Sequence, residues 1–255
     1  MVGLTLDSEN PFSLQGKKIL ITGASSGIGR QVAIDCTRFG AKVVLSARNE
    51  ERIKQVMSKL ESNGHSYILG DLTDEETIKR ITESVGNIDG LVLCAGIGKT
   101  LPFKFCKRED INEVYEVNLF SQIELFRSLI REKRINKNAS VVFLSSIGGL
   151  KVFTPGNIIY GSSKAALDSA MKFCALEFAP NIRVNSIMPG MVNTSLISGR
   201  SAWSSEQIAN DVKNYPLGRY GEPQDISNGV VFFLSDASKW ITGQALVIDG
   251  GRTLK

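Results

Sequence analysis

The chain has 255 residues and a formal net charge of +4 at pH 7, with 42% hydrophobic and 22% charged residues. This composition is typical of a water-soluble globular protein, and the length suits one large α/β domain. No apolar run approaches the roughly 18 residues of a membrane-spanning helix, and no basic run predicts a nucleic-acid surface. The start, "MVGLTLDSENPF", lacks the basic and then apolar segments of a secretory signal, so we expect a cytoplasmic protein.

Short β-branched runs alternate with longer helical patterns along the chain. Strands are expected at 18–22, 42–46, 66–70, 90–94, 140–145, 182–187 and 244–249. Most of these runs are continuously apolar, which is typical of strands that are buried on both faces of a parallel sheet. Helices are expected between them, at 27–39, 49–62, 73–85, 108–134, 160–179 and 223–236.

This alternation predicts the α/β class. We expect a single doubly wound, Rossmann-type domain over residues 1–255, with a seven-stranded, mainly parallel sheet and helices on both faces. The stretch 190–221 is rich in Ser, Asn, Gly and Pro and longer than an ordinary connection, so it is expected to be a substrate loop. Ligands of such sheets bind at the carboxyl ends of the strands, so the chemistry should lie in the loops that follow them.

A glycine-rich turn follows the first expected strand. The sequence "TGASSGIGR" places Gly23, Gly27 and Gly29 at the entrance to a helix. Glycines at such a turn permit a close approach of backbone N–H groups to a phosphate. Its position in the first βαβ unit predicts a dinucleotide site, with simple helix capping as the alternative.

The end of the second strand indicates which dinucleotide is bound. The sequence "LSARNEER" has no carboxylate at Ser46 or Ala47 that could accept hydrogen bonds from an adenine ribose. Arg48 follows, and it favours NADP(H) over NAD(H) as a bidentate clamp for the 2′-phosphate, with Ser46 or Asn49 assisting. A solvated arginine at a helix start is the alternative. Asp71, after the third strand, is expected either to hold the adenine amino group or to cap the next helix.

The histidine and cysteine content argues against other chemistries. His65 is the only histidine, which argues against a multi-histidine metal site and against a Ser-His-Asp hydrolase. The four cysteines, Cys36, Cys94, Cys106 and Cys174, form no C-x-x-C pair. We therefore expect buried free thiols and no metal site.

Several motifs, taken in order, resemble those of the short-chain dehydrogenase/reductase family. They are "TGASSGIG", "GDLTD", "CAG", "VNLF", "SSIGG", "YGSSK", "MPGMVNT" and "ITGQALVIDGG". The similarity extends over nearly the whole chain, from about residue 14 to residue 252. The order and spacing of the motifs are together highly specific, and the general layout is similar to that of 3-oxoacyl-thioester reductases.

The resemblance implies a catalytic set of Asn118, Ser146, Tyr160 and Lys164. A tyrosine hydroxyl has an ordinary pKa of about 10, too high for efficient proton exchange near neutral pH. Lys164 follows Tyr160 on the same helical face, where its charge is expected to lower that pKa. Tyr160 would then be the acid in carbonyl reduction and the base in alcohol oxidation, with Ser146 hydrogen-bonded to the substrate oxygen. The Asn118 main-chain carbonyl, at a break in the long helix, would position a water that links Lys164 to solvent.

The resemblance also implies a coenzyme site along the carboxyl ends of the strands. Lys164 would bind the nicotinamide ribose, while the Val192 backbone and the Thr194 hydroxyl would meet the carboxamide. Pro189 and Gly190 would turn the chain past the ring. The full set is Gly23, Ser25, Ser26, Gly27, Ile28, Gly29, Arg48, Asp71, Leu72, Cys94, Ala95, Gly96, Tyr160, Lys164, Pro189, Gly190, Val192 and Thr194.

Three positions depart from the family pattern. Cys94 replaces an asparagine that helps to tie the central strand near the coenzyme. Ser146 and Tyr160 are 14 positions apart, one more than in the commonest pattern, so the loop between them is expected to bulge. Ser26 stands where many NADP-preferring members have a basic residue, so the NADP(H) prediction depends mainly on Arg48.

These features together predict an NADP(H)-dependent carbonyl reductase or alcohol dehydrogenase that acts on a small molecule. A non-catalytic dinucleotide-binding or redox-sensing protein is the alternative, and the intact proton-transfer residues argue against it. No nucleic-acid or membrane partner is expected. The two long helices expected at 108–134 and 160–179 resemble those that pair between subunits of the family, which implies a homotetramer, with a dimer as the alternative.

Two segments, 97–106 and 191–215, are expected to line the substrate pocket. Phe103, Phe105 and Trp203 in these segments indicate either an apolar pocket or core and lid packing. The identity of the substrate does not follow from these residue types.

Overall fold

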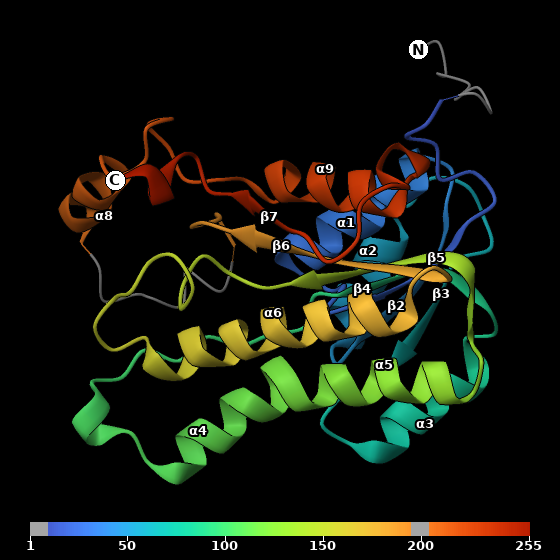
Figure 1. Ribbon diagram of the computed structural model, residues 1–255, viewed down its shortest axis with the longest axis horizontal. Helices are drawn as coiled ribbons and strands as arrows, with labels where there is room; N and C mark the ends of the chain where they lie inside the picture. The colour runs from blue at the N-terminus through green and yellow to red at the C-terminus, as the bar shows by residue number, and fades with distance from the viewer. Residues whose placement is uncertain (1–9, 195–203) are drawn as a thin grey trace.

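Seven parallel strands form the centre of the molecule, in the order β3-β2-β1-β4-β5-β6-β7. The computed structural model describes residues 10–194 and 204–255 (Figure 1). The strands are β1 (Lys18–Thr22), β2 (Lys42–Ala47), β3 (Ser66–Leu69), β4 (Ile88–Leu93), β5 (Ile135–Leu144), β6 (Ile182–Pro189) and β7 (Ala245–Ile248). Because β1 and β4 are neighbours, the strand order reverses between them, and dinucleotides bind at such a point.

Helices cover both faces of this sheet (Figure 1). One face carries α1 (Gly27–Arg38), α2 (Glu50–Met57) and α9 (Pro223–Leu234). The opposite face carries α3 (Glu75–Ser84), α4 (Arg108–Tyr115), α5 (Ser121–Arg131) and α6 (Ile158–Phe178). A further helix, α8 (Ser205–Val212), lies near the carboxyl terminus of the chain. This arrangement confirms the predicted doubly wound α/β class.

The strands are apolar throughout because each one contributes to two cores. In β1, Ile19 and Ile21 pack in the core beneath α1 and α9, whereas Leu20 packs in the core above α3, α5 and α6. All three side chains are fully buried. Burial on both faces thus explains why the sequence does not alternate between apolar and polar residues.

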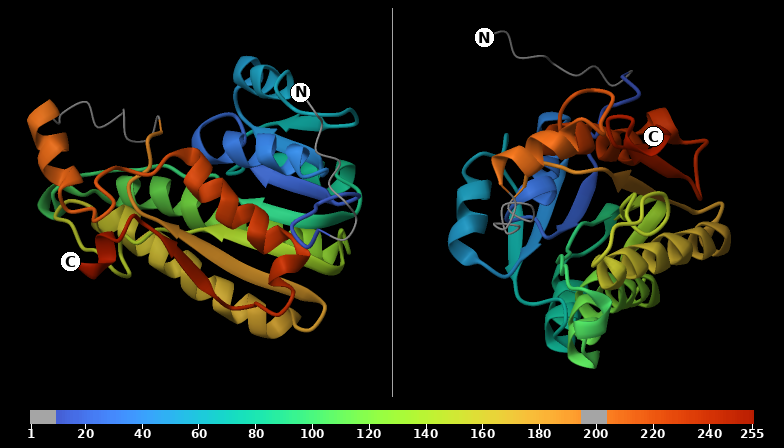
Figure 2. Two further views of the ribbon diagram at one scale, coloured as in Figure 1. Left: turned by 90° about the horizontal axis from the view of Figure 1, so that it is seen from above. Right: turned by 90° about the vertical axis from the view of Figure 1, so that its left-hand side faces the viewer.

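Helices α1 and α9 lie side by side on their face of the sheet (Figure 2). A buried carboxylate, Asp35 of α1, accepts hydrogen bonds at 3.1 Å from Gln31 and at 2.7 Å from Gln224 of α9. Arg38 forms an ion pair with Asp35 at 3.3 Å. A polar network therefore fixes the packing of these two helices against each other.

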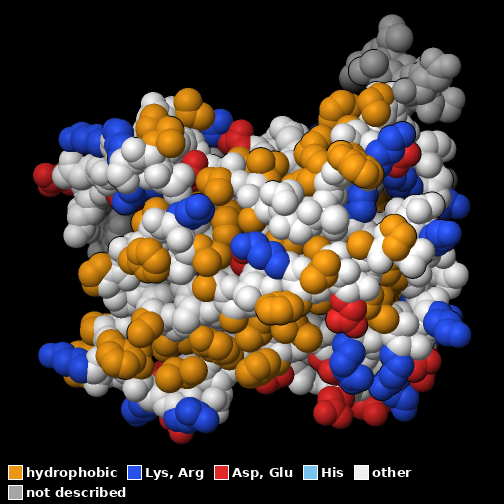
Figure 3. Space-filling model, viewed as in Figure 1, with side chains coloured by type: hydrophobic (Ala, Val, Ile, Leu, Met, Phe, Trp, Pro, Cys, Tyr) orange, Lys and Arg blue, Asp and Glu red, His pale blue; other side chains and the backbone are white. Residues whose placement is uncertain are grey.

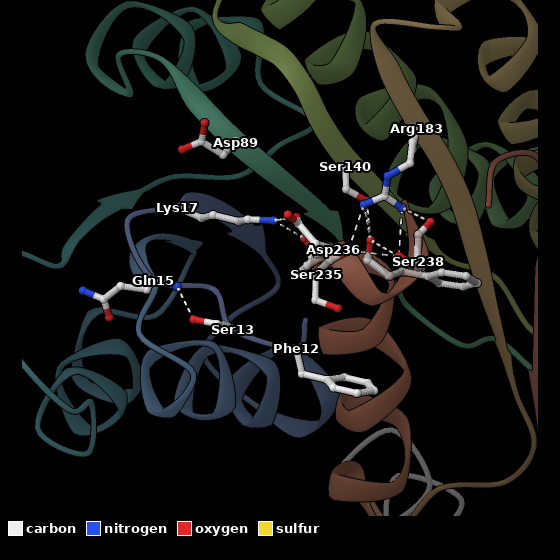
Figure 4. Close-up of polar contacts among 12 residues, drawn as sticks. Phe12, Ser13, Gln15, Lys17, Asp89, Ser140, Arg183, Ser235, Asp236 and Ser238 are labelled. Carbon is white, nitrogen blue, oxygen red and sulfur yellow. Dashed lines mark hydrogen bonds and ion pairs between the residues drawn. The ribbon is translucent and has the colours of Figure 1, made fainter. Parts of the chain in front are cut away.

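The amino ends of the strands carry a second polar network, shown in Figure 4. The Arg183 guanidinium of β6 donates to the carbonyls of Phe233, Ser235 and Ser238, at the carboxyl end of α9. Lys17 donates to the Leu234 carbonyl at 3.2 Å. These cations face the negative end of the helix dipole, far from the loops that follow the strands.

Several element boundaries differ from the sequence prediction. The expected helix 108–134 is interrupted by a π-helical turn, η2 (Glu116–Phe120), between α4 and α5. The expected helix 49–62 ends at Met57, and β5 begins at Ile135, five residues before the predicted strand. The predicted substrate loop contains α8, and its residues 195–203, Trp203 included, lie outside the described residues.

Among the described residues, no helix is both long enough and apolar enough to cross a membrane. Three 3-10 turns complete the described elements: η1 (Phe103–Phe105), η3 (Asp236–Ser238) and η4 (Arg252–Leu254).

Candidate active site

A cavity of about 380 Å³ opens at the carboxyl ends of β1 to β4. The residues in its wall come from the loops that follow these strands, as expected for a dinucleotide site. It is lined by thirteen of the predicted coenzyme residues: Gly23, Ser25, Ser26, Gly27, Ile28, Gly29, Arg48, Asp71, Leu72, Cys94, Ala95, Gly96 and Thr194. Among the described residues, Tyr160, Lys164, Pro189, Gly190 and Val192 do not line it directly.

The glycine-rich turn packs too closely for side chains. A β-carbon on Gly29 would lie 2.5 Å from the Gly23 carbonyl oxygen, and one on Gly23 would lie 2.9 Å from the Ala95 Cα. Helix α1 begins at Gly27, and Ser26 before it makes no side-chain capping hydrogen bond. The first turn of α1 also contains no acidic residue. Its first N–H groups are therefore suited to an anionic group such as a diphosphate.

Arg48 and Asp71 contact each other at the outer end of the cavity. The Arg48 guanidinium lies 3.1 Å from the Asp71 carboxylate, which also accepts hydrogen bonds from the Thr73 N–H and hydroxyl. Although partial burial opposes ionisation, these hydrogen bonds and the arginine keep the pKa of Asp71 below its ordinary value. Asp71 does not cap the next helix, because Asp74 is the N-cap of α3.

Sequence reasoning missed Arg52 at this end of the cavity. Arg52 belongs to α2, lines the cavity, and makes no ion pair among the described residues. A second arginine close to Arg48, in the first turn of the helix that follows β2, is the signal that could have identified it. Ser46 also lines the cavity, and its buried hydroxyl lacks a hydrogen-bond partner in the described part of the chain. This end of the cavity thus offers hydrogen-bond donors to a further anionic group.

Cys94, which replaces the family asparagine, is held by backbone contacts. The Thr22 hydroxyl accepts hydrogen bonds from the N–H groups of Cys94, at 3.0 Å, and Ala95, at 3.2 Å. The Gly29 N–H donates to the Cys94 sulfur. Burial raises the pKa of this thiol to about 11, against the influence of nearby Lys164, so it remains protonated at neutral pH.

Ser146 and Tyr160 flank the same glycine. A β-carbon on Gly148 would lie 3.4 Å from the Ser146 Oγ and 4.0 Å from the Tyr160 Cε1. Ser146 follows β5, and Tyr160 lies in the first turn of α6. The Ser146 Oγ accepts a hydrogen bond of 3.0 Å from the Gly148 N–H, which leaves the hydroxyl proton to donate elsewhere.

Lys164 and Asn118 flank a second glycine. A β-carbon on Gly96 would lie 3.3 Å from the Lys164 Nζ and 3.3 Å from the Asn118 Oδ1. Since Gly96 lines the cavity, both polar groups lie directly behind the coenzyme wall. The Lys164 Nζ donates to the Leu144 carbonyl at 2.7 Å, and its burial lowers its pKa to about 8, although nearby Cys94 opposes this shift.

Asn118 lies in the π-helical turn and uses its side chain as well as its backbone. Its carboxamide accepts from the Ile97 N–H at 2.8 Å and donates to the Ile97 carbonyl at 3.0 Å and to Ser163 at 3.1 Å. Its main-chain carbonyl, the group expected to position a water, accepts a hydrogen bond of 2.9 Å from Gln122. Gln122 is a second residue of this region that sequence reasoning missed.

The carboxyl end of β6 approaches the cavity from the other side. Pro189 ends β6, and the Gly190 N–H donates to the Ile248 carbonyl of β7 at 2.9 Å. Val192 forms an isolated bridge with Gly221. Thr194 lies against the glycine-rich turn, since a β-carbon on Gly27 would lie 3.2 Å from the Thr194 methyl group.

The loop between Ser146 and Tyr160 is compact. The Gly149 N–H donates a hydrogen bond to the Val152 carbonyl in a tight turn over residues 147–152. This turn accommodates the length of the loop. A β-carbon on Gly149 would overlap the Gly161 carbonyl of α6. The loop backbone therefore lies directly on the helix that carries Tyr160.

Three exposed phenylalanines lie on this loop and on the segment 97–106. Phe103, Phe105 and Phe153 are 70%, 59% and 78% exposed, so none of them belongs to the core. The two loops that carry them are joined by a hydrogen bond of 2.8 Å from the Leu101 N–H to the Gly156 carbonyl. The alternative of core packing is thus excluded for Phe103 and Phe105.

Comparison with known proteins gives the same family as these motifs. The chain matches the family model described as "Enoyl-(Acyl carrier protein) reductase" over residues 23–253. It is 35% identical over 242 residues to the 3-oxoacyl-[acyl-carrier-protein] reductase FabG of Rickettsia bellii, a match that covers 94% of this chain and 98% of that protein.

Two solved structures extend this comparison to the fold. One, a short chain dehydrogenase/reductase family protein, has a TM-score of 0.86 and 27% identity, and the match covers 95% of this chain and 100% of that one. The other, a putative 2-deoxy-D-gluconate 3-dehydrogenase from Agrobacterium tumefaciens with bound NADP, has a TM-score of 0.85 and 28% identity, with coverage of 97% and 100%. The chain therefore belongs to the short-chain dehydrogenase/reductase family of oxidoreductases.

Proposed function

We propose that this protein is an NADP(H)-dependent oxidoreductase that interconverts a carbonyl compound and a secondary alcohol, with Tyr160 as the general acid and base. One observation carries the proposal: Ser146 and Tyr160 meet at Gly148, while Lys164 and Asn118 meet at Gly96 in the wall of the dinucleotide cavity. A non-catalytic binding protein has no need of this grouping.

The substrate oxygen binds above Gly148, where the absence of a side chain leaves room for it. There the Ser146 hydroxyl donates a hydrogen bond, since it already accepts one from the Gly148 N–H. In reduction, Tyr160 gives its hydroxyl proton to the oxygen as negative charge develops on it, and in oxidation the phenolate takes that proton back.

Lys164 supports this proton transfer from behind the coenzyme wall. Its ammonium has three N–H donors, of which one is directed to the Leu144 carbonyl, so two remain for a ribose hydroxyl and for the phenol side of the site. The bound nicotinamide supplies or accepts the hydride. The chain itself orients the substrate, moves the proton and stabilises the charge on oxygen.

The polar groups at the outer end of the cavity fit NADP(H). The end of β2 has no carboxylate at Ser46 or Ala47, whereas Arg48 and Arg52 line the cavity together with the Ser46 hydroxyl, which has no partner among the described residues. Because Asp71 already pairs with Arg48, Arg52 supplies the additional positive charge for a 2′-phosphate. The solved relative from Agrobacterium tumefaciens contains bound NADP, which agrees with this preference.

The exposed aromatic side chains of the two loops favour an apolar substrate. Exposed Phe103, Phe105 and Phe153 provide hydrophobic contact area, which suits an acyl or aryl ketone better than a polyhydroxylated sugar acid. The match to a 3-oxoacyl-[acyl-carrier-protein] reductase agrees with an acyl chain. The reduction of a 3-oxoacyl thioester is therefore the first activity to test.

The test is a comparison of the wild-type protein with Tyr160→Phe. Oxidation of NADPH and of NADH is followed by absorbance with a 3-oxoacyl thioester, an aryl ketone and a keto sugar acid. The wild type should turn over the apolar ketones with NADPH, and Tyr160→Phe should lose about 10²–10⁴-fold in kcat while it still quenches NADPH fluorescence. Unchanged turnover in Tyr160→Phe would refute the proposal.

We infer that the protein also self-associates through α5 and α6. Both helices expose large apolar side chains, including Ile123 on α5 and Phe173 and Leu176 on α6, and Phe120 is exposed at the end of the adjoining π-helical turn. Hydrophobic side chains gather over these helices on the face shown in Figure 3. A second copy of the chain would cover them, and this agrees with the predicted homotetramer or dimer.

A further inference from the structure

The main chain of residues 94–97 is held by buried side chains from other elements. Thr22 accepts from the N–H groups of Cys94 and Ala95. Asn118 pairs with both polar groups of the Ile97 backbone. The Ala95 carbonyl, in the same stretch of main chain, accepts a hydrogen bond of 2.7 Å from Gln122.

Gln122 joins two stretches of backbone that the proposed reaction needs. It is completely buried in α5, and its Nε2 donates both to the Ala95 carbonyl at 2.7 Å and to the Asn118 carbonyl at 2.9 Å. Its third contact, to the Val117 carbonyl, is longer, at 3.4 Å. One carboxamide therefore links the wall of the coenzyme cavity to the π-helical turn.

The oxygen of this carboxamide lowers the stability of the fold. The Gln122 Oε1 is buried and has no hydrogen-bond partner among the described residues. An unpaired buried acceptor destabilises a fold, so core packing alone would favour an apolar side chain at this position. The two donated hydrogen bonds are what distinguish glutamine from a hydrocarbon of the same size.

We propose that Gln122 is a positioning residue of the active site, which ties Ala95 to Asn118 and thereby holds Gly96 against Lys164. Since Gly96 follows Ala95 directly, a shift of the Ala95 peptide changes the separation between the cavity wall and the Lys164 ammonium. Loss of the tie misplaces the coenzyme relative to Tyr160 and Lys164. This role rests on the proposed function, but the local order that it predicts does not depend on activity.

The test compares Gln122→Met and Gln122→Glu with the control Ser121→Ala. Methionine keeps the length of the side chain without its donors, and a glutamate buried beside these carbonyls would be neutral, with a single O–H that can donate to only one of the two. The control removes a buried hydroxyl that donates to the Val117 carbonyl at 3.1 Å in the same turn, with no contact to residues 94–97. Thermal unfolding, amide hydrogen exchange, NADPH fluorescence titration and turnover are measured for each protein.

In both Gln122 variants, peptides that cover residues 94–97 should exchange faster than in the wild type, and kcat should fall between about ten- and a hundred-fold. Ser121→Ala should leave both the exchange rate and kcat within about two-fold of the wild type, even if its melting temperature falls as much as that of the Gln122 variants. The proposal is overturned if exchange over 94–97 is unchanged in Gln122→Met, or if its kcat stays within two-fold of the wild type. An inactive wild type would refute the proposed function, and exchange would then decide the role of Gln122 by itself.

Discussion

Lys164 is buried, and the proposed chemistry needs its positive charge. Burial lowers the pKa of its ammonium to about 8, so the charged form predominates below that pH and is lost above it. The lowered pKa also means that the ammonium is an unfavourable group in this environment. Its persistence at neutral pH depends on acceptors such as the Leu144 carbonyl, 2.7 Å away.

We expect kcat/KM of the proposed reductase activity to fall at alkaline pH with a midpoint near pH 8, because loss of the Lys164 proton removes the positive charge that the proposed mechanism needs. Lys164→Arg keeps a positive charge at every accessible pH, so it should move the alkaline fall, or limb, of the kcat/KM profile to higher pH. Lys164→Met should abolish the limb along with most of the activity. A limb of unchanged midpoint in Lys164→Met would show that another group titrates.

At the scale of single residues, the sequence predicted identities better than contacts. Thirteen of the predicted coenzyme residues line one cavity, because their motifs follow strands whose carboxyl ends meet at one edge of the sheet. Lys164 and Asn118 lie behind this cavity at Gly96, and Ser146 and Tyr160 meet at Gly148. The pairing of Arg48 with Asp71 was not predicted, since it joins side chains from two loops whose relative placement depends on the folded sheet. Gln122 was missed because its partners are backbone carbonyls, which no residue type in the sequence reveals.

Helix α9 is fixed by polar contacts at its carboxyl end. The Arg183 guanidinium donates to three backbone carbonyls there, and the Ser140 hydroxyl donates to the Phe233 carbonyl at 2.6 Å (Figure 4). Desolvation lowers the pKa of Arg183, which agrees with a partly buried charge whose partners are carbonyl dipoles. The Phe233 carbonyl lies in the last turn of α9, where the helix itself supplies no N–H donor.

Arg183→Met should therefore reduce the free energy of unfolding by roughly 1.5–3 kcal/mol, as measured by urea denaturation, because hydrogen bonds to a charged group are lost. Arg127→Met is the matched control. Arg127 forms an exposed ion pair with Glu124 one turn away, and such pairs contribute about 0–1 kcal/mol. Equal destabilisation by the two substitutions would contradict this account of α9.

At the scale of elements, the sequence predicted every strand of the sheet but not the irregular turns. The π-helical turn at 116–120 interrupts an apolar periodicity that continues from α4 into α5, so the pattern indicates one helix. The early start of β5 was missed because Asn136, Lys137 and Asn138 are polar, and Asn138 adopts a φ of 68°. Both deviations arise from backbone conformation rather than from side-chain type.

The whole molecule presents an apolar face that a single copy leaves exposed to water. Phe173 and Leu176 of α6 are 73% and 82% exposed, and α6 packs beside α5 through the rings of Phe178 and Phe126, whose centroids are 5.4 Å apart. Exposed apolar patches of this kind mark interfaces. The proposed partner is a second copy of the same chain.

Light scattering after gel filtration should then give a mass that is a multiple of 27.8 kDa for the wild-type protein. The double variant Phe173→Ser/Leu176→Ser should shift toward the monomer at micromolar concentration. Leu217→Ser, which changes an exposed leucine elsewhere, should leave the mass unchanged. A monomeric wild type, or a double variant with an unaltered mass, would exclude this face as an interface.

The overlap that a side chain on Gly149 would cause with the Gly161 carbonyl has an evolutionary consequence. Gly149 has no room for a side chain, and a β-carbon on Gly161 would lie 3.2 Å from the Gly149 Cα, so the geometry of the Ser146 loop relative to α6 tolerates little change. New specificity must then arise farther out, at positions such as Phe103 and Phe153, where replacements meet solvent. Directed evolution toward other ketones should accordingly accumulate its changes in that outer rim.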